Sequence, residues 1–214
     1  MDIRTHDLLR LNNLSSLITT HPEPEWVHEA LTLAPFAVVR RAPIEKGEIP
    51  VGIRGSSRSE RFAAFILKES IIERITPENL VEQKAWKQSP RQHEVHALGC
   101  LDRVDEILQF YELPWGPGGS VGFELASGIA TVTAASDLDI VVRPPSFLSI
   151  EKAEGILQEF RALSVRIDAQ VETPNGAISL IEYARGESQV LLRTMDGPRL
   201  VKDPWVKGST LNVR

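Results

Sequence analysis

The sequence predicts a mixed α/β (α+β) protein built from two parts. Short apolar runs of strand length alternate with longer stretches whose apolar residues recur at helical spacing. The clearest strand, Val165 to Glu172, alternates strictly between apolar and polar residues, which is typical of a half-buried strand. A boundary is indicated at Gln88-Ser89-Pro90. We therefore expect a small N-terminal α/β domain over residues 1–88 and a mixed sheet flanked by helices over residues 89–214.

Composition limits the classes of partner. The net charge of -5, the pI of about 5.6 and the 6% aromatic content argue against a nucleic-acid partner. The single cysteine, Cys100, rules out an intrachain disulfide and is expected to be a small buried core residue. The first residues lack the pattern of a signal peptide, and no apolar run approaches the ~18 residues of a membrane helix. We expect a cytoplasmic protein without a membrane partner.

The N-terminal part is expected to begin with a short helix or turn and to contain a hairpin between two helices. Apolar spacing and flanking prolines predict a helix over residues 25–33. Two apolar runs separated by a turn predict a hairpin of strands. Thr76-Pro77-Glu78 is a typical helix start. The expected ranges are 6–12 for the first helix or turn, 25–33 for the second helix, 36–41 and 49–55 for the hairpin, and 77–86 for the last helix.

The hairpin region is locally cationic in an acidic protein. Six basic residues stand against three acidic ones: Arg40, Arg41, Lys46, Arg54, Arg58 and Arg61 against Glu45, Glu48 and Glu60. One interpretation is a solvated hairpin face. The other is a platform for a polyphosphate or an acidic partner, because the arginine fork matches phosphate and carboxylate geometry. On the second interpretation Arg54 and Arg58, together with Arg143 farther along the chain, are candidate substrate-binding residues.

The C-terminal part contains two further helices at helical apolar spacing. The first is expected as one long helix over residues 91–112. The second is expected over residues 150–163, with Ser149 as its N-cap and with Ala153, Ile156, Leu157, Phe160 and Leu163 as its apolar side.

Between these helices lies the stretch with the most chemical content, from Gly118 to Val142. A Gly119-Ser120 turn is expected to open a short helix with Ser120 as N-cap, and Gly128 is expected to end it. The free N–H groups at the start of that helix suit a phosphate. Asp137 and Asp139 then lead into a buried strand, where residues two apart share a face.

Two neighbouring carboxylates repel each other unless a cation lies between them. Mg²⁺ suits such oxygen ligands, and it usually takes one or two carboxylates together with substrate phosphates. A third carboxylate, Asp168, stands on the polar face of the alternating strand, and Glu172 is a further candidate on that face. We therefore predict a site for a metal-bound nucleoside triphosphate or a close analogue.

A Gly-Ser turn, a later Asp-x-Asp and a third acid on a following strand resemble the nucleotidyltransferase fold shared with DNA polymerase beta. Gly119-Ser120, Asp137-Leu-Asp139 and Arg166-Ile-Asp168 match these features in order. The gap between Ser120 and Asp137 is longer than is usual in that superfamily. The resemblance implies that the C-terminal part is a sheet of the nucleotidyltransferase type.

The whole chain also resembles the malonate decarboxylase holo-acyl-carrier-protein synthases, which are phosphoribosyl-dephospho-CoA transferases. The matching segments are His6–Leu9, Val38–Ala42, Ile49–Gly55, Gly118–Phe123, Ser136–Asp139, Val171–Pro174, Leu191–Thr194 and Asp203–Trp205. The resemblance implies that a serine of the acyl-carrier subunit attacks a triphosphoribosyl-dephospho-CoA donor. Pyrophosphate leaves, and a phosphodiester attaches the prosthetic group to the carrier.

The residues suit this reaction, for which two Mg²⁺ ions would align the serine oxygen and neutralise the pyrophosphate. We hypothesise that Asp137 and Asp139 bridge the ions and that Asp168 binds the ion nearest the serine or accepts its proton. Gly119 and Ser120 would hold the departing phosphates. Two alternatives stay open: an enzyme of the same fold that moves AMP or another nucleotide to a protein or small molecule, and a non-catalytic binding module.

Overall fold

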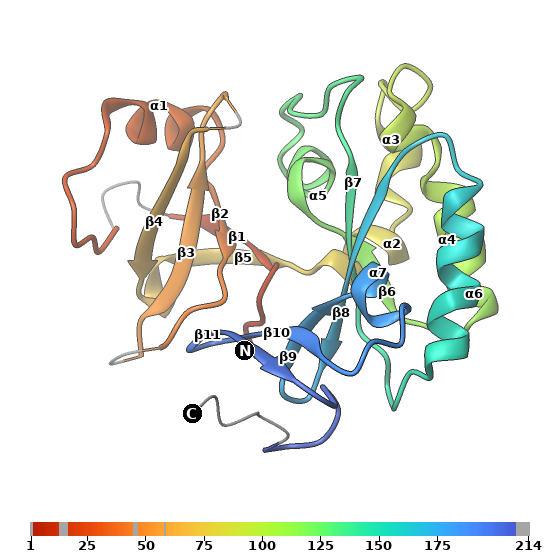
Figure 1. Ribbon diagram of the computed structural model, residues 1–214. Coiled ribbons are helices and arrows are strands. Elements are labelled where there is room, and N and C mark those ends of the chain that lie inside the picture. The colour runs from red at the N-terminus through yellow and green to blue at the C-terminus, as the bar shows by residue number, and fades with distance from the viewer. Residues whose placement is uncertain (1, 13–16, 45–46, 58, 209–214) are drawn as a thin grey trace. The chain divides into compact units, whose positions relative to one another are not determined.

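The computed structural model describes residues 2–12, 17–44, 47–57 and 59–208. The chain divides into two compact units, Met1–Thr76 and Pro77–Arg214, and each carries its own sheet (Figure 1). The observed mixture of helices and sheets is the predicted α+β class.

The first unit is an antiparallel sheet covered by a helix. Its elements are β1 (Leu8–Leu11), α1 (Glu25–Leu33), β2 (Phe36–Val39), β3 (Ile49–Arg54), β4 (Arg61–Ile66), the 3-10 helix η1 (Lys68–Ser70) and β5 (Ile71–Ile75). The strand order is β4-β3-β2-β1-β5. The predicted hairpin is confirmed, because Val38 of β2 lies opposite Gly52 of β3. Val27 and Leu31 of α1 are buried in the core of this sheet.

The first expected element differs in part. Residues 5–6 form a turn, but the residues that follow form strand β1, with Leu8 paired to Val38 on one side and to Ile75 on the other. Leu9 and Leu11 are buried in the core of the sheet. Pairing with two strands distant in sequence outweighs the weak local preference for a helix over so short a segment.

The second unit is a six-stranded mixed sheet with helices. Its elements are α2 (Pro77–Glu82), the 3-10 helix η2 (Ala85–Gln88), α3 (His96–Gly99), α4 (Leu101–Phe110), β6 (Trp115–Pro117), α5 (Gly119–Ser127), β7 (Leu138–Val142), α6 (Ile150–Arg161), β8 (Ile167–Thr173), β9 (Gly176–Ser179), α7 (Leu180–Tyr183), β10 (Val190–Thr194) and β11 (Gly197–Val201). The strand order is β11-β10-β9-β8-β7-β6. β7 and β8 are parallel, and the other neighbours are antiparallel.

One face of this sheet forms the core with α4 and α6, which Figure 1 shows side by side. As predicted, Ser149 caps α6 by accepting a hydrogen bond from the Lys152 amide, and Ala153, Ile156, Leu157 and Phe160 are its buried side. The fifth predicted residue, Leu163, lies beyond the end of the helix at Arg161 and is only partly buried against the core. The long helix expected over residues 91–112 is instead a series of turns over residues 90–94, followed by α3 and α4. Cys100, between these two helices, is buried as predicted, and burial raises the pKa of its thiol to about 11.

The division between the units falls earlier than the boundary expected at residue 88. Residues 77–88 belong with the second unit because their side chains lie in its core: Trp86 is fully buried there. The backbone of Pro77 also lies so close to Gly116 of β6 that a Cβ at this glycine would come within 2.1 Å of it. Among the described residues, no helix is both long and apolar enough to span a membrane.

Candidate active site

The register of the two parallel strands brings two of the predicted carboxylates together. Asp139 of β7 is the direct partner of Asp168 of β8. Their flanking residues, Leu138 and Ile140 on β7 and Ile167 on β8, are buried in the core. Since side chains alternate between the faces of a strand, both aspartates lie on the opposite face, on strands about 4.8 Å apart.

Asp137 lies one residue before the start of β7 and is partly buried. Among the described residues, none donates a hydrogen bond to the carboxylate of Asp137 or of Asp168, and none forms an ion pair with either. Partly buried carboxylates without protein donors, next to a third carboxylate, fit a site that takes up a cation.

The complete three-carboxylate ligand set stays a prediction. Among the described residues, no three His, Cys, Asp or Glu side chains form a group that could hold a metal ion. The in-register pair Asp139 and Asp168 is the part that the structure brings together. This pair fits Mg²⁺, which commonly binds through one or two carboxylates and leaves its other positions to water and substrate phosphates.

The start of α5 lies directly on β7. The Gly118 amide donates to the Asp139 carbonyl over 2.9 Å. Gly119 has a positive φ of 53°, and a Cβ at this position would lie 1.8 Å from Oδ2 of Asp139. Only glycine permits this approach. The turn predicted to bind phosphate therefore lies against the carboxylate predicted to bind metal.

Ser120 does not have the predicted capping role. The N-cap of α5 is Gly118, and Ser120 is the second residue inside the helix, where its carbonyl accepts a hydrogen bond from the Thr131 hydroxyl. The glycine turn, which needs a positive φ at Gly119, shifts the helix start by two residues. Gly128 ends the helix in the left-handed conformation, as predicted.

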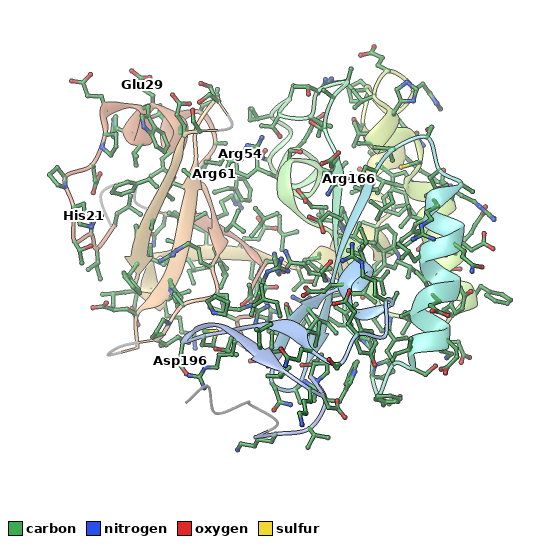
Figure 2. The ribbon with its side chains drawn as sticks, in the orientation of Figure 1. His21, Glu29, Arg54, Arg61, Arg166 and Asp196 are labelled. Carbon is green, nitrogen blue, oxygen red and sulfur yellow. The ribbon has the colours of Figure 1, made fainter. Side chains whose placement is uncertain are left out.

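Sequence reasoning did not assign a role to Arg166, which precedes β8 and is labelled in Figure 2. Its carbonyl accepts a hydrogen bond from the Leu138 amide, so it continues the β7–β8 ladder. Its side chain is exposed and pairs with no other described residue. The signal was present in the sequence, since Arg166 and Asp168 are two residues apart on an alternating strand.

The three arginines predicted to bind substrate are Arg54, Arg58 and Arg143. Arg143 follows β7 at the end away from Asp137, where it is mostly buried in an ion pair with Glu78, so the structure does not bring it to the aspartates. Arg54 of β3 lies directly opposite Arg61 of β4 in the first unit, and Figure 2 labels both. Arg58 lies outside the described residues. A substrate-binding role for these arginines stays a prediction.

Models of known protein families match both parts of the chain. The model of the phosphoribosyl-dephospho-CoA transferase MdcG N-terminal domain matches residues 4–77, and the model of its C-terminal domain matches residues 82–204. This chain belongs to the phosphoribosyl-dephospho-CoA transferase family. No solved structure matches it significantly.

Similar phosphoribosyl-dephospho-CoA transferases cover nearly the whole chain. The protein of that name from Pseudomonas putida is 41% identical over 202 residues, 94% of this chain and 95% of its own length. Those from Pseudomonas syringae pv. tomato and Klebsiella pneumoniae are each 39% identical, over 92% and 96% of their own lengths and 94% of this chain. The in-register aspartates and the α5 turn lie within the C-terminal domain match of this transferase family.

Proposed function

We propose that this transferase attaches the phosphoribosyl-dephospho-CoA group to a serine of the acyl-carrier subunit of malonate decarboxylase. The donor would be 2'-(5''-triphosphoribosyl)-3'-dephospho-CoA. The family supports this choice of donor. The observation that carries the proposal is the in-register pair Asp139 and Asp168 with Gly119 directly against Asp139.

The carboxylates and the helix start have complementary tasks. Asp139 and Asp168, with Asp137 beside them, would hold Mg²⁺. A bound Mg²⁺ would neutralise phosphate charge and make the attacking oxygen easier to deprotonate. The backbone N–H groups of Gly119 and Ser120 would bind the departing phosphates at the positive end of α5.

The reaction forms one bond and breaks another. The serine Oγ of the carrier bonds to the phosphorus next to the donor ribose, and the bond from that phosphorus to the pyrophosphate oxygen breaks. Asp168 would bind the metal or accept the serine proton. Arg166 would add positive charge near the leaving pyrophosphate, because it stands at the start of the strand that carries Asp168. A cytoplasmic location is the compartment that we expect for this reaction.

The test is intact-mass analysis of the carrier subunit after incubation with this protein, Mg²⁺ and the donor. We expect a mass gain that matches the prosthetic group. Asp139→Asn and Asp168→Asn should each lower the rate on the order of a hundredfold or more, because each removes a charge from the reacting site. Glu159→Gln is the matched control, since Glu159 is a half-exposed carboxylate of α6 paired with Arg103.

Full activity of both aspartate variants would refute the assigned site. A carrier that gains AMP from ATP but nothing from the triphosphoribosyl donor would favour the alternative nucleotide transfer. No modification from any donor, together with no Mg²⁺-triphosphate binding in calorimetry, would favour a binding module.

A further inference from the structure

The connection between α5 and β7 links the two halves of the proposed site. It begins after Gly128 and ends at Asp137, and it is the reason for the long sequence gap between Ser120 and Asp137. A connection of this length without a helix or strand needs internal contacts to hold one conformation. In this protein one buried acid and one arginine supply several of those contacts.

Glu124 is the only charged residue between Gly118 and Ser136, and it is 5% exposed. It lies on α5, and its carboxylate accepts hydrogen bonds from the backbone amides of Thr131 and Val132 over 2.7 and 2.8 Å. A buried carboxylate is retained only where donors satisfy it. Here two of those donors are backbone groups of the connection itself.

Arg91 completes the cluster from the turns before α3. Its Nη1 lies 2.8 Å from each carboxylate oxygen of Glu124, and its Nη2 donates to the Val132 carbonyl over 2.9 Å. The guanidinium therefore contacts both the acid and the connection. Lysine could not reproduce this, because it lacks the planar fork.

Beyond this cluster, further hydrogen bonds join the connection to each half of the proposed site. Toward the phosphate-binding turn, the Thr131 hydroxyl donates to the Ser120 carbonyl over 2.9 Å. Toward the metal-binding carboxylates, Thr133 and Ser136 close a tight turn, in which the Ser136 amide donates to the Thr133 carbonyl and the Thr133 amide donates to the Ser136 hydroxyl. Asp137 is the next residue.

We propose that Arg91 and Glu124 are a positioning pair that sets the place of Asp137 and Asp139 relative to the Gly119-Ser120 turn. The proposal rests on the proposed function of that site. In this role both residues act through the connection, whose backbone groups they bind. Small displacements of reacting groups lower rates strongly, and about 1 Å can cost on the order of a hundredfold.

The test compares Glu124→Gln with Glu159→Gln, which alters the exposed ion pair between Glu159 of α6 and Arg103 of α4. Gln keeps the size of Glu124 but replaces one acceptor oxygen with a donor. We expect kcat per folded molecule to fall between about tenfold and a hundredfold, with the KM for the donor within about threefold. Glu159→Gln should leave both constants unchanged. An unchanged kcat, or a fall that only follows the unfolded fraction, would overturn the proposal.

Hydrogen exchange provides a readout that does not depend on transfer. In Glu124→Gln we expect faster amide exchange at Thr131 and Val132, and also at Asp137 and Ser120, with β10 unchanged. Faster exchange confined to Thr131 and Val132 would mean that Glu124 does not stabilise the backbone at Ser120 and Asp137. That result would refute the positioning role. If the wild-type protein leaves the carrier unmodified, the proposed function fails, while this exchange pattern still decides whether the pair positions the aspartates.

Discussion

At the scale of single residues, the proposed site contains a glycine, Gly119, at a position where any side chain would collide with one of its acids. Gly119 meets the carboxylate of Asp139 with a backbone that L-residues rarely adopt. Two costs would therefore arise together on substitution: backbone strain and a collision with the carboxylate of Asp139, which we propose to bind metal. The chain offers a way to separate them, because Gly128 at the other end of α5 also has a positive φ but has no neighbour within 4 Å of a Cβ.

We predict that Gly119→Ala strongly lowers the rate of transfer while Gly128→Ala keeps it. Both variants should lose about 1–2 kcal/mol of unfolding free energy from the left-handed conformation. Only Gly119→Ala should displace Asp139, and its rate should fall at least on the order of a hundredfold. Denaturant unfolding and the carrier mass assay measure the two effects. Equal activity of the two variants would show that the contact between Gly119 and Asp139 has no catalytic consequence.

At the scale of elements, polar side chains of α4 form hydrogen bonds with segments both before and after it in the chain. Asp105 of α4 is buried and accepts hydrogen bonds from Lys84, from Gln109 over 2.7 Å and from the Trp115 indole over 3.1 Å. The Trp86 indole donates to Asp102, one turn earlier on the same helix. Polar groups of α4 thus hold the η2 region and β6, whose C-terminal end leads directly into the α5 turn.

We predict that Asp105→Ala lowers the free energy of unfolding by about 3–5 kcal/mol, because it leaves buried donors without their acceptor. The control is Glu106→Ala on the same helix, which removes an exposed pair with Arg103 and should cost less than about 1 kcal/mol. Urea unfolding of both variants provides the comparison. Similar costs for the two would mean that the buried cluster contributes no more than a surface ion pair.

At the scale of the whole molecule, the chain has two separate cores. The first is built on the five antiparallel strands around Leu9, Val51 and Ile66, and the second on the six-stranded sheet. The family matches, which end at residue 77 and resume at residue 82, follow the same division. That the second sheet is of the nucleotidyltransferase type stays a prediction.

We predict that a fragment of residues 77–214 unfolds cooperatively, whereas a fragment of residues 89–214 does not. The shorter fragment lacks Trp86, which is fully buried, and Lys84, which pairs with Asp105. Loss of a buried aromatic alone costs about 3–5 kcal/mol, a large share of the stability of such a domain. Thermal unfolding followed by near-UV circular dichroism distinguishes the fragments. Equal cooperativity would favour the boundary at residue 88.

The sequence by itself determined the features that depend on neighbours along the chain. Alternation of apolar and polar residues predicted β8 and its polar face with Asp168, and helical spacing with a serine cap predicted α6 and its buried side. The resemblance of ordered segments also predicted the family that the comparisons show. These inferences succeed because period and capping are local properties.

Only the tertiary structure decided which distant residues meet. The register that pairs Asp139 with Asp168, the approach of Gly119 to Asp139 and the contact of Arg91 with Glu124 join residues that are far apart in sequence. It also decided that residues 6–12 contribute a strand and that residues 77–88 belong with the second unit. The physical reason is that burial and hydrogen-bond satisfaction are set by the whole core, and they outweigh the small local preferences on which sequence patterns depend.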